Sequence, residues 1–150
     1  MEPGLNTIDI ALIDDSEDDI LMMREAVALS APLKITEVFH NGMEALEKLI
    51  LNSRPAQLPD LILLDINMPR INGFDVIRKL KNDARLRIVP TILLTTSNRE
   101  EDVLKAYALG ASSYIQKPFE FDELVNSTRC VASYWSAMLL PNHNLRPQTF

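Results

Sequence analysis

Acidic, hydroxyl and amine side chains follow several apolar runs of this sequence. Asp14 and Asp15 follow one run, Asp65 ends a second, Thr95 ends a third, and Lys117 follows a fourth. Three carboxylates brought together repel one another and need a counter-charge, which a lysine and a divalent cation can supply. An all-oxygen site with few protein ligands suits Mg²⁺. A carboxylate nucleophile, Mg²⁺, a lysine and a hydroxyl are sufficient for phosphoryl transfer.

The elements that would position these residues alternate along the chain. Short apolar runs predict five strands, at residues 8–13, 34–39, 60–65, 90–95 and 112–116. Stretches of helical period predict five helices, at residues 17–29, 42–52, 74–82, 100–109 and 121–138, the first capped by Ser16. This alternation predicts an α/β fold with a doubly wound five-stranded parallel sheet. For five strands, the flavodoxin-like order 2-1-3-4-5 is the expected topology.

That strand order would gather the polar residues at one place. In an open parallel sheet, ligands bind beyond the carboxyl ends of the strands, where the strand order reverses. Strands one and three flank this point and end in acids, strand four ends in Thr95, and strand five leads into Lys117. We therefore expect the acids, the hydroxyl and the lysine to share one crevice.

Composition limits the classes of function. The 150 residues fit one domain at 1–140 followed by a tail at 141–150, and a formal net charge of −6 argues against a nucleic-acid partner. The single cysteine, Cys130, excludes an intrachain disulfide. No apolar stretch approaches the roughly 20 residues of a membrane span, so we expect a soluble, cytoplasmic protein with no membrane contact. The four glycines are too far apart for a phosphate-binding glycine loop.

Four segments together resemble a known family. Asp14-Asp15, residues 61–73 (LILLDINMPRING), residues 93–96 (LLTT) and residues 110–119 (GASSYIQKPF) resemble the receiver domains of two-component response regulators. The resemblance covers residues 8–139, with the motifs in the family's order and spacing. It implies a phosphorelay switch, not an enzyme with turnover, that accepts a phosphoryl group from a sensor histidine kinase.

The resemblance also implies roles for individual residues. Asp65 would be the phosphoryl acceptor. Asp15, Asp65 and the backbone carbonyl of Asn67 would bind Mg²⁺, and Asp14 would act mainly through a water bound to the metal. Lys117 would pair with the Asp65 carboxylate or with its phosphoryl group.

Signal transmission would use two further residues in the same family pattern. The Thr95 hydroxyl would turn toward the phosphoryl group, and Tyr114 would change rotamer into the space that Thr95 leaves. The family pattern also implies a cis bond at Lys117–Pro118, which the sequence alone does not settle.

A narrower resemblance rests on two segments. The long connection at residues 52–59 and the segment 132–141 (ASYWSAMLLP) are similar to the small stand-alone regulators paired with phytochrome-type histidine kinases. The partner would then be a phytochrome-type kinase.

Other charged residues have simpler interpretations. Glu17, Asp18 and Asp19 lie in the first turn of a predicted helix, where acids favour the helix dipole, so we interpret them as a solvated cap. His40 and His143 are interpreted as loop and tail residues and not as phosphoryl donors.

Two rival functions fit the fold less well. An aspartate-nucleophile phosphatase needs a second acid two residues after the nucleophile, and Asn67 occupies that position. A flavin-binding module of flavodoxin type would not need the acidic cluster, which would repel the flavin phosphate.

The end of the last predicted helix indicates an assembly. Its second half, with Tyr134, Trp135, Met138 and Leu139, would overhang the domain by roughly 15 Å and expose an apolar cluster. We expect these residues to form a two-fold homodimer interface with strand five and the preceding helix. The alternative is that the tail folds back over the cluster within one chain.

Overall fold

A computed structural model describes residues 7–51 and 58–141 of the chain. Within these ranges five parallel strands form one sheet in the order β2-β1-β3-β4-β5. The strands are β1 (Ile8–Ile13), β2 (Leu33–Phe39), β3 (Leu61–Asp65), β4 (Thr91–Thr95) and β5 (Ser113–Gln116). The predicted fold and strand order are therefore confirmed.

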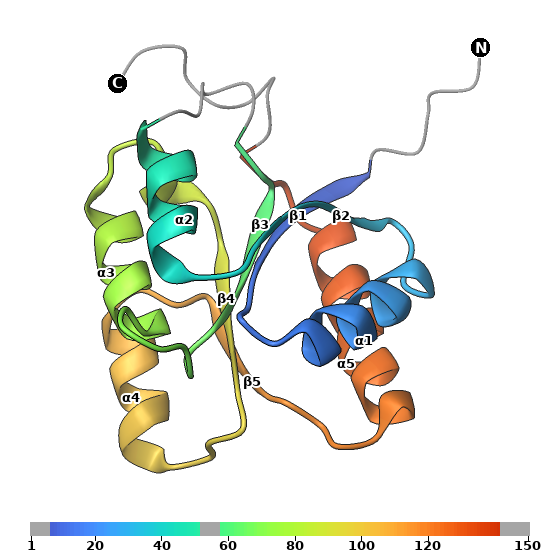
Figure 1. Cartoon of the computed structure of the whole chain (residues 1–150). Coiled ribbons are helices and arrows are strands. Elements are labelled where there is room, and N and C mark those ends of the chain that lie inside the picture. Colours follow the sequence, from blue (N-terminus) through green and yellow to red (C-terminus); the bar gives the residue numbers. More distant parts are fainter. Residues whose placement is uncertain (1–6, 52–57, 142–150) are drawn as a thin grey trace, which may run out of the picture.

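Helices cover both faces of the sheet. They are α1 (Glu17–Ala28), α2 (Gly42–Leu46), α3 (Gly73–Asn82), α4 (Glu100–Ala108) and α5 (Phe121–Ser136), with a π-helical turn at Glu47–Leu51 and a 3₁₀ turn at Leu86–Ile88. Figure 1 shows α2, α3 and α4 on one side of the sheet and α1 and α5 on the other. No helix among the described residues is long and apolar enough to cross a bilayer.

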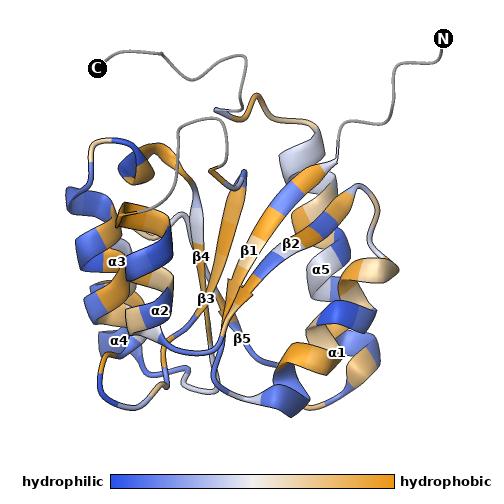
Figure 2. Cartoon of the chain, turned by 45° about the horizontal axis from the view of Figure 1, so that its top comes forward, coloured by the Kyte–Doolittle hydropathy of each residue, from blue (hydrophilic) through white to orange (hydrophobic). Residues whose placement is uncertain are grey.

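Each face of the sheet has its own apolar core. Because successive strand residues point to opposite faces, Ile13 and Leu64 pack beneath α2, α3 and α4, while Leu12 and Leu63 pack against α1 and α5. Strands β3 and β4 are buried along their whole length, as a parallel strand covered on both faces must be. The apolar strands lie inside and hydrophilic residues gather at their ends (Figure 2).

Two predicted helices differ from the observed ones by more than one residue at their ends. The helix expected at residues 42–52 is regular only to Leu46 and continues as a π-helical turn to Leu51. The last helix ends at Ser136, two residues before the predicted end, and Leu140 packs against the α1–α5 core. The straight overhang expected from residues 131–140 is therefore wrong. Residues 52–57 and 142–150, with the tail and His143, lie outside the described residues.

Candidate functional site

Three carboxylates meet at the carboxyl ends of β1 and β3. One carboxylate oxygen from each of Asp14, Asp15 and Asp65 lies within 4.8 Å of the others. Asp14 and Asp65 are buried, whereas Asp15 is exposed. Strands β1 and β3 are neighbours in the sheet, so their carboxyl ends place the three acids in one crevice, as the sequence predicted.

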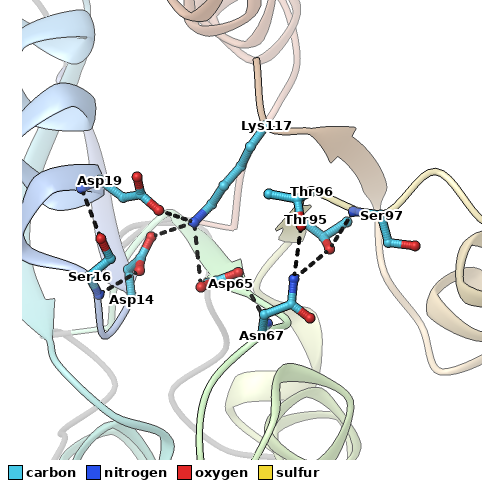
Figure 3. A network of polar contacts seen from close by, with 9 residues as sticks. All are labelled: Asp14, Ser16, Asp19, Asp65, Asn67, Thr95, Thr96, Ser97 and Lys117. Carbon is cyan, nitrogen blue, oxygen red and sulfur yellow. Dashed lines mark hydrogen bonds and ion pairs between the residues drawn. The ribbon is translucent and has the colours of Figure 1, made fainter. Parts of the chain in front are cut away.

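Lys117 reaches this crevice from the loop after β5. Its Nζ lies 2.8 Å from Asp19 Oδ2, 3.0 Å from Asp14 Oδ2 and 3.4 Å from Asp65 Oδ2. Figure 3 shows the three carboxylates converging on this one amine. Burial alone lowers the pKa of Lys117, but the hydrogen bond to Asp19 and the charges of Asp65 and Asp14 outweigh burial and raise it. The lysine is therefore a permanent cation.

The Asp65 carboxylate is not fully compensated by this cation. Burial, together with the charge of Asp14, raises the pKa of Asp65 to about 6, although Lys117 and the Asn67 backbone N–H act to lower it. Asn67 donates this N–H to Asp65 Oδ1 at 3.2 Å. Three oxygen donors carrying excess negative charge fit a hard divalent cation. The part of the Asn67 carbonyl as a metal ligand stays a prediction.

The Thr95 hydroxyl lies beside the acids on the neighbouring strand. Thr95 is completely buried, and its Oγ1 accepts from the Asn67 side-chain amide at 3.2 Å and from the Ser97 N–H at 3.1 Å. The same amide lies 3.4 Å from the Thr96 hydroxyl (Figure 3). The side chain of Asn67 thus joins the ends of β3 and β4. The sequence pattern indicated a part for the Asn67 carbonyl but not for its side-chain amide.

Tyr114, on β5, also contacts the segment after β4. Its hydroxyl donates to the Ser97 carbonyl at 2.9 Å, and its ring packs against the core beneath α4. Thr95 and Tyr114 therefore hold the N–H and the carbonyl of the same residue, Ser97. This shared contact links the two residues that the sequence predicted as a switch, although the rotamer change itself stays a prediction.

Short polar interactions shape the loops around the acids. Ser16 caps α1 by accepting the Asp19 N–H, and Asp14 Oδ1 accepts the Ser16 N–H. Gly73 begins α3 very close to the end of β3, since a Cβ there would lie 2.6 Å from the Asp65 carbonyl oxygen. Only glycine permits this close approach of the α3 N-terminus to strand β3.

Two interpretations of the sequence need correction. Asp19 is not a simple solvated cap, because its carboxylate makes the shortest contact with Lys117. No local sequence pattern indicated this contact, because it joins side chains from two distant segments of the chain. The cis peptide bond within the described residues is Ala31–Pro32, not Lys117–Pro118.

The fold and the site define a class of protein that comparison with known sequences bears out. The family model "Response regulator receiver domain" matches residues 10–129 of this chain. The chain belongs to this family, whose members act in phosphorelay signalling.

Individual relatives share the whole fold. The phosphorylated cyanobacterial phytochrome response regulator RcpA is 33% identical, with a TM-score of 0.79, and the match covers 91% of this chain and 99% of RcpA. RPA3017, a response regulator in red light signalling of R. palustris, is 28% identical with a TM-score of 0.80, over 89% and 98% of the two chains. Response regulator Rcp1 of Synechocystis sp. is 29% identical over 84% of this chain and 87% of its own, and its Mn²⁺-bound form has been solved. This chain is thus a receiver similar to phytochrome response regulators.

Proposed function

We propose that Asp65 is the residue that accepts the phosphoryl group from a histidine kinase. A carboxylate oxygen of Asp65 attacks the phosphorus of a phosphohistidine, an O–P bond forms, and the P–N bond breaks with its electron pair passing to the imidazole. The observation that carries the proposal is the position of Asp65, buried at the end of the central strand with Lys117 Nζ 3.4 Å away. The Lys117 cation would neutralise charge on the transferred group.

Mg²⁺ is the proposed cofactor of this step. Asp14, Asp15, Asp65 and the backbone carbonyl of Asn67 would hold it, with Asp14 acting through a metal-bound water. When bound, the ion would supply the positive charge that the three carboxylates lack and would orient phosphoryl oxygens. The raised pKa of Asp65 supports this proposal, because burial and the charge of Asp14 disfavour the ionised carboxylate more than Lys117 favours it.

Phosphorylation of isosteric variants tests the acceptor. We expect wild-type protein to take up radiolabelled phosphoryl from a small donor such as acetyl phosphate, in the presence of Mg²⁺, and Asp65→Asn to take up none. Asp60→Asn, a matched change just before the amino end of the same strand, should behave as wild type. Equal labelling of the Asp65→Asn and Asp60→Asn proteins would overturn the assignment.

The metal ligands can be tested separately from the phosphoryl acceptor. Asp15→Ala should weaken Mg²⁺ binding strongly, because it removes a charged ligand. The Asp15 side chain is exposed, so the change should leave the fold intact. Isothermal titration of the wild-type and variant proteins with magnesium chloride measures this loss. Unchanged affinity would remove Asp15 from the ligand set.

The switch would run from Thr95 to Tyr114. Phosphorylation would draw the Thr95 hydroxyl toward the new group and away from Ser97, and Tyr114 would then repack against the segment that Ser97 occupies. Their shared contact with Ser97 supports this route. Thr95→Ala should still accept phosphate but transmit less of the change to α4 and β5. Full wild-type chemical-shift changes on β5 after phosphorylation of Thr95→Ala would exclude it.

The proposed kinase partner is of the phytochrome type. RcpA and RPA3017, by name, belong to phytochrome and red-light signalling, which supports the same pairing for this chain. A phosphotransfer profile against purified histidine kinases of the host tests it. We expect the fastest transfer from a phytochrome kinase, and faster transfer from another class would overturn the pairing.

We also propose a homodimer through the β5–α5 edge. A groove of about 550 Å³ lies there, lined by residues that include Ile92, Ile115, Cys130, Val131, Tyr134 and Trp135. Beside it, Tyr134, Met138 and Leu139 are exposed, the last at 92%. Aromatic and methionine side chains are enriched in interface cores, and a second copy of the chain offers a self-complementary surface.

The dimer test must avoid residues that stabilise the monomer. Trp135 packs against the α1–α5 core and edge-on against Tyr134, so its removal would also destabilise the fold. Tyr134→Ser with Leu139→Ser changes only exposed side chains. We expect wild type to sediment as a dimer at tens of micromolar and the double variant as a monomer. A monomeric wild type, with and without phosphorylation, would refute the dimer.

A further inference from the structure

The shortest ion pair of Lys117 is with a residue that has no assigned part in phosphoryl transfer. Its Nζ lies 2.8 Å from Asp19 Oδ2 but 3.4 Å from Asp65 Oδ2. An ammonium group has three N–H donors, and Asp14, at 3.0 Å, is a further acceptor. The amine is hydrogen-bonded to Asp19 and Asp14 and lies farther from Asp65, so Asp65 has the weakest hold on the cation (Figure 3).

The Asp19 carboxylate is free for this contact because it is not used in the helix cap. Asp19 is the third residue of α1, where an acidic side chain often accepts the N–H of the capping residue. In this protein the Ser16 N–H is taken by Asp14 instead, at 3.0 Å. The cap still holds through the Asp19 N–H and the Ser16 hydroxyl, at 3.2 Å. The backbone of Asp19 thus stabilises the helix while its side chain turns to Lys117.

The two partners of this contact differ in their freedom to move. The Asp19 side chain is 43% exposed and the Asp65 side chain 5%, so water can replace Lys117 around Asp19 but not around Asp65. Losing the contact therefore costs Asp19 little. A newly bound phosphoryl group at Asp65 would carry more negative charge than Asp19 and could draw the lysine away.

We propose that Asp19 is a positioning residue that holds Lys117 away from Asp65 until a phosphoryl group arrives. The inference rests on the proposed function, because it assumes that Lys117 serves the group on Asp65. In this proposal Asp19 competes with the phosphoryl group on Asp65 for Lys117, so the Asp19–Lys117 ion pair breaks each time Asp65 is phosphorylated. Removal of the Asp19 charge makes the phosphoryl-bound state easier to reach.

Beryllofluoride, which stands in for the phosphoryl group on a carboxylate, measures this competition at equilibrium. We expect Asp19→Asn to bind beryllofluoride, with magnesium chloride at a saturating concentration, about three- to fivefold more tightly than wild type. Asp18→Asn is the matched control, because it removes the same charge from the same exposed helical turn. Its affinity should change less than twofold. Asp19→Glu, which restores the carboxylate, should return the affinity toward wild type.

The outcomes separate this inference from the proposed function. If wild type binds beryllofluoride and Asp19→Asn binds no better than Asp18→Asn, the competition is refuted while the acceptor site stands. Weaker binding by Asp19→Asn would also refute it, since Asp19 would then be holding Lys117 in its productive position. Failure of wild type to bind beryllofluoride or to take up phosphoryl would overturn the proposed function itself. Thermal unfolding of the three variants checks that α1 remains capped.

Discussion

The carboxyl end of the sheet and its β5–α5 edge are built in opposite ways. At the carboxyl end, Asp14, Asp65 and Thr95 are buried polar residues held by short contacts, and no buried side-chain polar atom of the described residues lacks a partner. At the edge, no residue of β5 is fully buried, and an apolar groove lies open beside α5. The first region confines charge among largely buried groups, whereas the second leaves apolar surface in water.

The contrast fits the two proposed functions, which are phosphoryl chemistry at the carboxyl end of the sheet and partner binding at the β5–α5 edge. Confined charges respond strongly to a new phosphoryl group, because interactions are strong where water is excluded. The edge strand is only partly buried, so it can change its packing at lower cost in free energy than a buried strand. Tyr114 connects the two regions, because it lies on the edge strand β5 and its hydroxyl is hydrogen-bonded to the Ser97 carbonyl beside the site.

The largest expected effect comes from disturbing the close fit at the site. Gly73→Ala would push a methyl group to 2.6 Å from the Asp65 carbonyl oxygen, so we expect it to lower the free energy of unfolding by about 2–4 kcal/mol. Ser127→Ala, which changes a groove-lining residue, should lie within about 0.5 kcal/mol of wild type. Urea denaturation of both variants measures the difference. Equal losses of unfolding free energy in the two variants would show that the site is not more closely packed than the β5–α5 edge.

A smaller effect, of opposite sign, follows from the confined charge. The pKa of Asp65 is raised from 3.8 to about 6, so its stabilising contribution is fully present below pH 3.8 and is lost as pH rises through 6. Without divalent cations at pH 7.5, Asp65→Asn should therefore stabilise the fold by about 1–2 kcal/mol. The gain should vanish near pH 4 and shrink when Mg²⁺ is added. A pH-independent gain would show that the charge is not its cause.

The smallest effect concerns the link between the two regions. Tyr114→Phe removes the hydroxyl that donates to the Ser97 carbonyl and should cost about 1 kcal/mol of unfolding free energy. We expect amide exchange to accelerate on β5 and in the Ser97 segment, and to stay unchanged on β1. Acceleration confined to β5 would show that the hydroxyl does not couple the edge to the site.

Much of this arrangement could be predicted from the sequence, because the main polar residues of the site lie at the ends of strands. A buried parallel strand fixes where its last residue lies, so Asp65 and Thr95 were placed by the apolar runs before them. The contact between Asp19 and Lys117 depends on side-chain directions from two distant segments, which no local pattern encodes. The course of the chain after Ser136 was missed for a similar reason, since the apolar stripe continues past the end of the helix and packs in another backbone conformation.

The chemical position of the transferred group tests the central claim most directly. Protein phosphorylated by its kinase can be reduced with sodium borohydride, which converts an aspartyl phosphate to homoserine, and then digested and sequenced by mass spectrometry. We predict homoserine at position 65, with Asp14 and Asp15 unchanged. Homoserine at either of those positions, or phosphate retained on His40, would contradict the assignment of Asp65 as the acceptor.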